Sequence, residues 1–137
     1  MKHITLKCYD GFKHFDSTFS FQSDHGKVNI HFDFKGFKID VEDNYPFLAL
    51  SKIRLELEKI GVKIMCNGAR LNVYPSGAAL GSLKAYELEM GKSVTAASLV
   101  FIFDGFNDIA QIATVAKQKE YYRKWLNSVG MGDYQNI

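Results

Sequence analysis

The chain has 137 residues, a length typical of one domain, so we expect a single α+β domain over residues 1–137. Its composition, 47% hydrophobic and 23% charged, excludes disordered and collagen-like chains. Seventeen Lys and Arg against fifteen Asp and Glu leave a net charge of +2, too small for a dedicated nucleic-acid-binding protein.

The N-terminal segment has no signal-peptide pattern, because Lys and Asp interrupt every apolar run in it. No stretch approaches the ~20 apolar residues of a membrane span. We therefore expect a cytoplasmic protein with no membrane contact. Cys8 and Cys66 are far apart and outside any C-x-x-C pair, so both are predicted to be reduced and buried.

The first third of the chain predicts antiparallel strands. Two are expected around residues 4–9 and 18–22, and apolar and polar residues then alternate over 28–34 and 37–41. Lys35-Gly36 fits a two-residue turn that joins the last two into a hairpin. That turn predicts four cross-strand pairs: Phe34 with Phe37, Phe32 with Ile39, Asp33 with Lys38, and His31 with Asp40.

A helix is predicted over residues 46–60. Pro46 suits its first turn, and Gly61 suits the left-handed residue that follows a helix. Its apolar stripe recurs at three and four residues and consists of Leu50, Ile53, Leu57 and Ile60. Arg54 and Glu58, one turn apart, are expected on the exposed side.

Shorter elements are predicted after this helix. Strands are expected over 62–66, 70–74 and 83–89, with Asn67-Gly68 as a tight turn between the first two. Periodicity does not decide whether 99–103 is a buried strand or a short helix.

The last predicted element is a helix that begins at Asn107 or Asp108 and reaches Ser128, with Gly130 behind it. One stripe of it carries Ile112, Val115, Tyr122, Leu126 and Val129. The complete expectation is an α+β fold: an antiparallel sheet with an N-terminal hairpin, a central helix packed on one face, and a C-terminal helix. Its core is expected to contain Phe32, Phe34, Phe37, Ile39, Leu50, Ile53 and Leu57.

Catalytic and metal-binding patterns are weak throughout. Gly91-Lys92-Ser93 lacks the earlier glycine of a phosphate-binding loop, and Ser76 lacks the frame of a nucleophile elbow. Glu87 and Glu89 share one side of a predicted strand, a spacing that a glycosidase carboxylate pair could use. Neighbouring acidic residues are also common on a solvent-exposed strand face. The four histidines, His3, His14, His25 and His31, lack metal-ligand spacing and are predicted to be surface residues. We expect no metal, no cofactor and no catalytic residue.

The last predicted helix is locally basic, with aromatic residues between its charges. Such a mixture is found in weak RNA-binding modules, but Glu120 interrupts the basic patch. An amphipathic helix whose rings dock on the sheet explains the same residues, and we favour it.

Residues 61–104 carry three short motifs: C-N-G-x-R at 66–70, V-Y-P-S-G at 73–77 and K-A-Y at 84–86. In these the chain resembles an uncharacterised family of small bacterial proteins that often accompany polymorphic or contact-dependent toxin clusters. The family continues after V-Y-P-S-G with a methionine and a glycine run, where this chain has residues 78–82, shorter and less glycine-rich.

The resemblance implies a non-enzymatic protein-binding domain, an immunity protein that neutralises a toxin encoded by an adjacent gene. The alternatives are a small enzyme or ligand-binding domain that uses the loop from Arg70 to Gly77, and a weak RNA-binding module. On a strand over 70–74, Arg70 and Tyr74 would share one face, and Arg and Tyr are favoured interface residues. The partner-binding candidates are Asn67, Arg70, Tyr74, Ser76, Tyr122 and Trp125.

Overall fold

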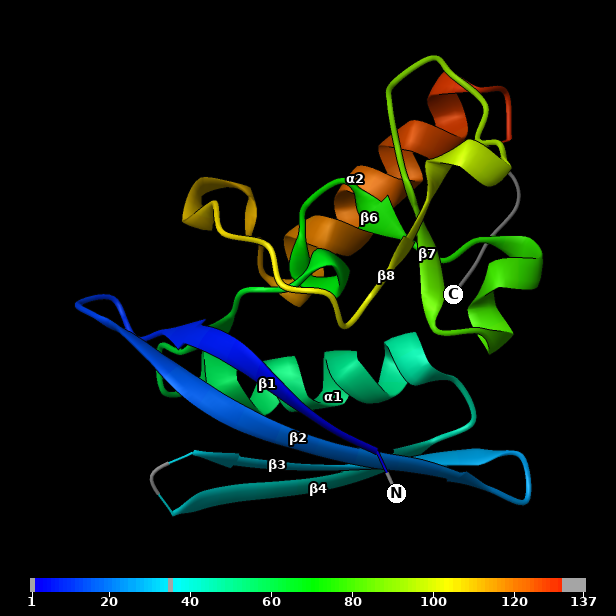
Figure 1. Ribbon diagram of the computed structural model, residues 1–137. Coiled ribbons are helices and arrows are strands. Elements are labelled where there is room, and N and C mark those ends of the chain that lie inside the picture. The colour runs from blue at the N-terminus through cyan, green and yellow to red at the C-terminus, as the bar shows by residue number, and fades with distance from the viewer. Residues whose placement is uncertain (1, 35, 132–137) are drawn as a thin grey trace.

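An antiparallel sheet forms one side of the molecule. The computed structural model describes residues 2–34 and 36–131, and for Ala78 only the backbone. Within that range a five-stranded sheet has the order β4-β3-β2-β1-β5. Its strands are β1 (Lys2–Tyr9), β2 (His14–Asp24), β3 (Lys27–Phe34), β4 (Phe37–Asp43) and β5 (Lys63–Ile64). Helix α1 (Pro46–Glu58) follows β4 and lies against this sheet (Figure 1).

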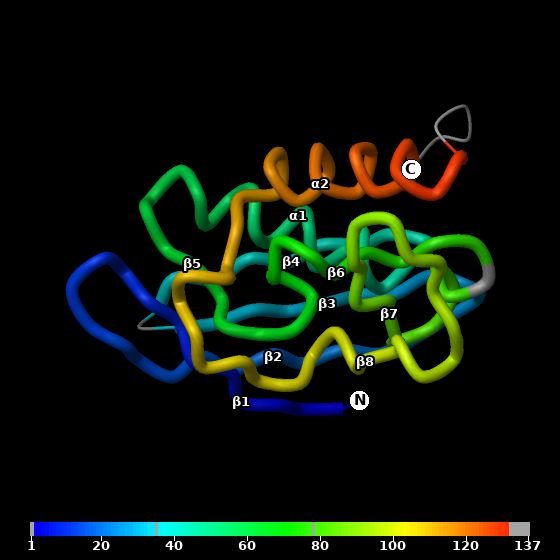
Figure 2. Tube along the Cα trace, turned by 90° about the horizontal axis from the view of Figure 1, so that it is seen from above, coloured from blue at the N-terminus to red at the C-terminus, as the bar shows by residue number. Residues whose placement is uncertain are grey.

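The second half of the chain forms a layer on the other side of α1 (Figure 1). It contains a small antiparallel sheet of β6 (Val73–Tyr74), β7 (Lys84–Glu87) and β8 (Leu99–Phe101), in that order. Helix α2 (Val115–Ser128) lies in the same layer (Figure 1) and runs beside the small sheet when the molecule is seen from above (Figure 2). Short 3-10 turns connect these elements: η1 (Asn67–Ala69), η2 (Gly77–Gly81), η3 (Ala96–Ser98) and η4 (Ile109–Gln111).

The predicted hairpin is confirmed in its register. Phe34 pairs with Phe37 and Phe32 with Ile39, and on the other face Asp33 pairs with Lys38 and His31 with Asp40. Strand β2 is longer than the predicted 18–22, and it pairs with β1 along the whole length of β1. The α+β class, the central helix and the C-terminal helix are also confirmed. Of the expected core residues, Phe37 is 38% exposed and Phe34 is only half-buried.

Helix α1 is buried on two sides. Leu50, Ile53 and Leu57 belong to the core shared with the five-stranded sheet, whereas Phe47 belongs to the core beneath β6, β7 and α2. The prediction that Arg54 is exposed is wrong, because the second layer covers it and leaves 4% exposed. The helix ends at Glu58 rather than 60, so Ile60 lies outside it and is 48% exposed.

The elements between the helices are shorter than predicted. The three predicted strands are observed only at residues 63–64, 73–74 and 84–87. The turn predicted at Asn67-Gly68 is the 3-10 turn η1, which extends to Ala69. For residues 99–103 the structure decides for a strand, β8, entered from a 3-10 turn that Thr95 caps.

The start predicted for the last helix is wrong. Asp108 caps the short η4 turn, and Thr114 is the N-cap of α2, with its side-chain oxygen accepting a hydrogen bond from the Lys117 amide. Neither α1 nor α2, the α-helices in the described part of the chain, is long and apolar enough to cross a membrane.

The inner face of the five-stranded sheet is covered by two segments. Helix α1 lies over β3 and β4. Phe103, which follows β8, stacks on Phe21 of β2 with ring centroids 5.1 Å apart and approaches Phe19 at 6.1 Å. The segment after β8 therefore joins the small sheet to the large one.

Candidate functional site

A buried polar network connects α1, α2 and η1. The Arg54 guanidinium donates to Gln118 Oε1 at 2.6 Å, to the Ala113 carbonyl at 2.7 Å and to the Gly68 carbonyl at 3.3 Å. The Gln118 amide in turn donates to the carbonyls of Gly68, Arg70 and Val73 at 2.8–2.9 Å. Burial lowers the pKa of the Arg54 guanidinium. The hydrogen bonds of Arg54 and Gln118 described above all join groups of this chain, so we assign the network to structure.

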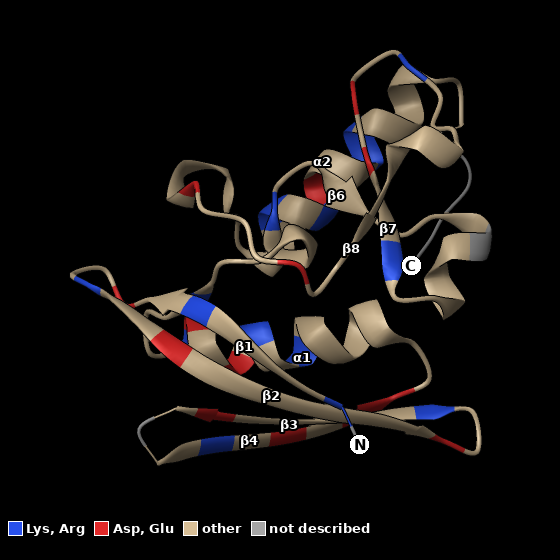
Figure 3. Ribbon diagram, viewed as in Figure 1, with Lys and Arg blue, Asp and Glu red and all other residues tan. Residues whose placement is uncertain are grey.

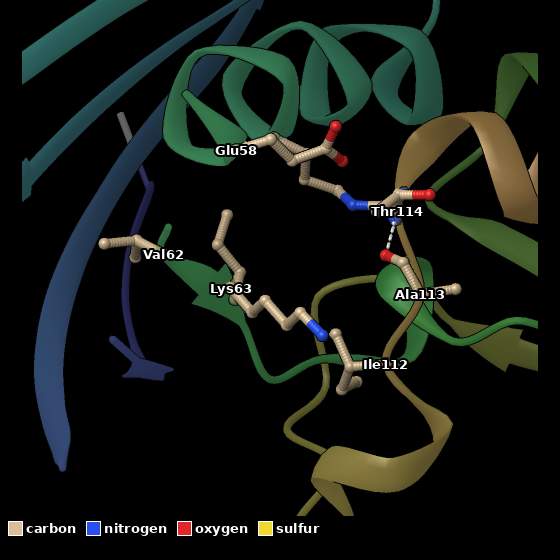
Figure 4. Close-up of a pocket in the computed structure, with 8 residues that line it drawn as sticks. Glu58, Val62, Lys63, Ile112, Ala113 and Thr114 are labelled. Atoms are coloured by element: carbon tan, nitrogen blue, oxygen red, sulfur yellow. Dashed lines mark hydrogen bonds between the residues drawn. The ribbon is translucent and has the colours of Figure 1, made fainter. Parts of the chain in front are cut away.

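A small cavity borders this network, lined by Arg54, Glu58, Lys63, Thr114 and neighbouring apolar side chains (Figure 4). Its volume of about 20 Å³ is enough for roughly one water molecule. Glu58 Oε2 accepts a hydrogen bond from the Val115 amide at 2.8 Å, which places a carboxylate at the N-terminus of α2. The cavity therefore belongs to the junction of the two helices.

The aromatic candidates form a buried stack beneath α2. Tyr74 stacks on Tyr122 with centroids 4.3 Å apart and meets Phe47 edge-on at 4.9 Å. Tyr74, Tyr122 and Trp125 are 4%, 6% and 2% exposed. The half-buried Ser76 hydroxyl lies 3.3 Å from the Tyr122 hydroxyl. The rings of Tyr122 and Trp125 dock inward, as the amphipathic interpretation of this helix predicted.

Arg70 is the centre of a second cluster. Its guanidinium lies over the Phe106 ring, 4.0 Å from the centroid, and forms an ion pair with Glu87 at 2.8 Å. It also donates to Asn67 Oδ1 at 3.3 Å, and its buried Nε has no hydrogen-bond partner in the described chain. Arg70 precedes β6 rather than lying in it, so the shared strand face predicted with Tyr74 is wrong.

The C-N-G-x-R motif has a steric reason at Gly68. A Cβ atom there would lie 2.6 Å from Leu50 Cδ2 and 3.2 Å from the Ile102 carbonyl oxygen. The Gly68 amide donates to that same carbonyl at 2.9 Å, and Asn67 Nδ2 donates to the Phe101 carbonyl at 3.0 Å. The motif thus fixes η1 against α1 and the end of β8.

The K-A-Y motif reaches the surface beside this joint. Lys84 and Tyr86 of β7 pair with Phe101 and Leu99 of β8, so the four side chains share one face of the small sheet. Phe101 is 49% exposed, the other three are partly buried, and Lys84 Nζ lies 4.9 Å from the Phe101 ring centroid. We call these four residues the β7–β8 surface. Only its Lys84 and Tyr86 could have been recognised from the motif.

The outer face of the large sheet carries a polar row across four strands. His3, Ser20, His31 and Asp40 are successive cross-strand partners on β1, β2, β3 and β4. A hydrogen bond joins His3 Nδ1 to Ser20 Oγ at 2.7 Å, and His31 Nδ1 lies 2.5 Å from Asp40 Oδ1. Ser20 bonds to His3, whereas Asp40 bonds to His31. The row is therefore two separate pairs, and no single histidine connects the serine to the aspartate as in a catalytic triad.

The remaining sequence candidates are engaged in local contacts. Glu89 forms an ion pair with Lys92 at 3.2 Å in the turn at Gly91, and Trp125 Nε1 donates to the Lys92 carbonyl at 2.9 Å. Glu87, by contrast, is the partner of Arg70. Among residues 2–34 and 36–131, no three His, Cys, Asp or Glu side chains gather closely enough to hold a metal ion.

Both thiols are free and buried. Cys8 Sγ donates to Ser17 Oγ at 3.3 Å, and Ser17 donates onward to the Leu6 carbonyl at 2.8 Å. Burial raises the pKa of both thiols to about 11. A thiol with so high a pKa is a poor nucleophile at neutral pH, so neither cysteine has the environment of a catalytic residue.

Comparison with known proteins found no matching family model and no match among curated proteins.

Proposed function

We propose that this chain is a non-enzymatic protein-binding domain, an immunity protein that occludes a toxin encoded by an adjacent gene and acts in the bacterial cytoplasm. The observation that carries the proposal is the β7–β8 surface, where a half-exposed Phe101 stands on a rigid frame built by the motif residues. Aromatic side chains, Phe among them, are enriched in protein interfaces relative to the rest of the protein surface.

The frame beneath this surface supports a binding role because it holds Phe101 in place before a partner arrives. Asn67 Nδ2 bonds to the Phe101 carbonyl, and the Asn67 and Gly68 amides donate to the carbonyls of Asp104 and Ile102. A preorganised surface loses little conformational entropy on binding. The C-N-G-x-R and K-A-Y motifs therefore support one surface: the first bonds to the backbone around Phe101, and the second contributes Lys84 and Tyr86 to it.

The chemistry of the surface limits the partner. Phe101 and Leu99 offer apolar area, and the Lys84 ammonium beside the ring suits a carboxylate at the rim of the partner's pocket. The net charge of +2 would repel the basic surface common in nucleases. We therefore propose a toxin whose binding surface is apolar with an acidic rim.

The test is to co-express this chain with the product of its neighbouring gene and to measure the dissociation constant of the complex. Phe101→Ala should weaken binding about thirtyfold, because truncation of an interface anchor costs about 2 kcal/mol. The matched control is Phe12→Ala, at the turn between β1 and β2, where the side chain is 94% exposed and remote from the β7–β8 surface. This control should leave the dissociation constant unchanged.

Thermal unfolding of each variant alone separates a binding effect from a folding effect. If the neighbouring product is not toxic and forms no complex, the immunity function is refuted. If a complex forms but Phe101→Ala and Phe12→Ala bind equally well, binding occurs elsewhere and the assignment of the β7–β8 surface is refuted.

A further inference from the structure

Strand β4 is an open edge of the large sheet. The strand order β4-β3-β2-β1-β5 leaves one side of β4 without a neighbouring strand. A free strand edge presents unpaired N–H and C=O groups and is a template for another strand. At seven residues, β4 is long enough for such pairing.

The structure shows which backbone groups of β4 point to this edge. Lys52 Nζ of α1 donates to the Glu42 carbonyl at 2.7 Å, so that carbonyl is directed away from β3. Because backbone direction alternates along a strand, Lys38 and Asp40 have the same orientation as Glu42. Their amides and carbonyls are the free groups of the edge, whereas Glu42 is already engaged by Lys52.

A groove runs along the same edge, lined by apolar side chains and by the charged side chains of Lys38, Asp40, Lys52 and Glu56. It lies between β4 and α1 and has a volume of about 520 Å³, with Phe37, Ile39, Val41 and Leu55 as its apolar lining. Leu55 is 47% exposed and Phe37 is 38% exposed. An added strand would therefore find both backbone partners and an apolar surface for its inward-facing side chains.

The side-chain pattern of β4 is complementary to itself. With a two-fold axis at Ile39, antiparallel pairing of two β4 strands places Lys38 opposite Asp40 of the second copy, and the reverse. The same register places Phe37 opposite Val41 of the second copy on the inner face. Figure 3 shows both basic and acidic positions on β4. We propose that two copies of this chain pair along β4 and form one continuous sheet.

Other registers are less favourable. An axis at Asp40 places this carboxylate opposite itself and requires the Glu42 backbone that Lys52 occupies. An axis at Val41 places Asp40 opposite Glu42 of the second copy. The axis at Ile39 forms two opposite-charge pairs and uses only the free backbone groups. It also extends the polar row, because Asp40 already contacts His31 on its other side.

The test is sedimentation equilibrium over a wide range of protein concentration. We expect the unmodified chain to dimerise, and Lys38→Asp or Asp40→Lys alone to weaken self-association about tenfold, because each replaces two attractive pairs with repulsive ones. An equimolar mixture of the two variants should form a heterodimer of unmodified affinity, since both cross-strand pairs then again join one acidic and one basic side chain. Misfolding of a variant could not be repaired by mixing.

Glu42→Lys is the register control and should leave the dimer intact. The proposal is overturned if the unmodified chain is monomeric at its highest soluble concentration, or if both charge reversals leave the dimer unchanged. It is also overturned if mixing fails to restore association, or if Glu42→Lys dissociates the dimer, which would indicate the axis at Asp40. None of these outcomes depends on a toxin partner.

Discussion

At the scale of single residues, Gly68 shows why a turn motif can matter to the whole protein. It packs so closely against Leu50 and Ile102 that no side chain fits without movement, and the Ile102 contact includes a backbone atom. Asn67 and Arg70 on either side depend on that position, because they bond to β8 and Glu87 from the same turn. The absence of a side chain at Gly68 therefore sets how closely the η1 turn approaches α1 and the segment after β8.

Gly68→Ala should lower the free energy of unfolding by about 1–3 kcal/mol, the usual cost of overpacking a dense core. The matched control is Gly81→Ala, where a Cβ atom would meet nothing within 4 Å and φ is not positive. Urea unfolding of both variants gives the comparison. Equal midpoints for the two would contradict the close-approach explanation.

At the scale of elements, Gln118 joins α2 to α1 and to the turns between them. Its side chain is 1% exposed, accepts from Arg54 and donates to three carbonyls. The contact with Arg54 bridges 64 positions of the chain. Because the hydrogen bonds of the buried Arg54 guanidinium in the described chain go to neutral acceptors, Arg54 is sensitive to the loss of any one of them, even with the Glu58 carboxylate nearby.

Gln118→Leu should destabilise the protein by about 3 kcal/mol or more, because it leaves Arg54 and several buried carbonyls without partners. Gln111→Leu is the control, since Gln111 is exposed and its side chain bonds to Asp108 in its own turn. The double variant Arg54→Met with Gln118→Leu should lose less free energy of unfolding than the two single variants lose in sum. Additive losses in denaturant unfolding would show that the two side chains are not coupled.

At the scale of the whole molecule, the buried thiols link stability to alkaline pH. Burial raises the folded-state pKa of Cys8 and Cys66 from the ordinary thiol value of 9.0 to about 11. Below pH ~8 the thiols are protonated in both the folded and the unfolded state, and this contribution is constant. Above it the unfolded state loses protons first, so stability falls until the pH passes the folded pKa.

The free energy of unfolding should therefore decrease by about 2 kcal/mol per thiol between pH 8 and 10.5. The double variant Cys8→Ala with Cys66→Ala should show a correspondingly smaller decrease in the free energy of unfolding over that interval. Tyr74, whose pKa burial raises to about 12, adds a loss above pH ~10 that both proteins share. Parallel curves for the two proteins would show that the thiols do not contribute.

The sequence by itself determined the features that depend on neighbouring residues. Alternation and one two-residue turn were enough to predict the register of β3 and β4, because a strand that slips by one residue exposes its whole apolar face. Pro46 and Gly61 likewise predicted the position of α1.

Only the tertiary structure decided which polar and aromatic side chains reach the surface. Arg54 has the spacing of an exposed helix residue, and Tyr74, Tyr122 and Trp125 have the chemistry of an interface, yet all four are buried once the second layer packs on α1. That layer is held by contacts between residues far apart in the chain, such as Arg54 with Gln118 and Asn67 with Phe101. The spacing of apolar residues along a helix or strand predicts one buried face for that element. It cannot show that α1 has two, because the second face is defined by side chains that approach only after the chain has folded.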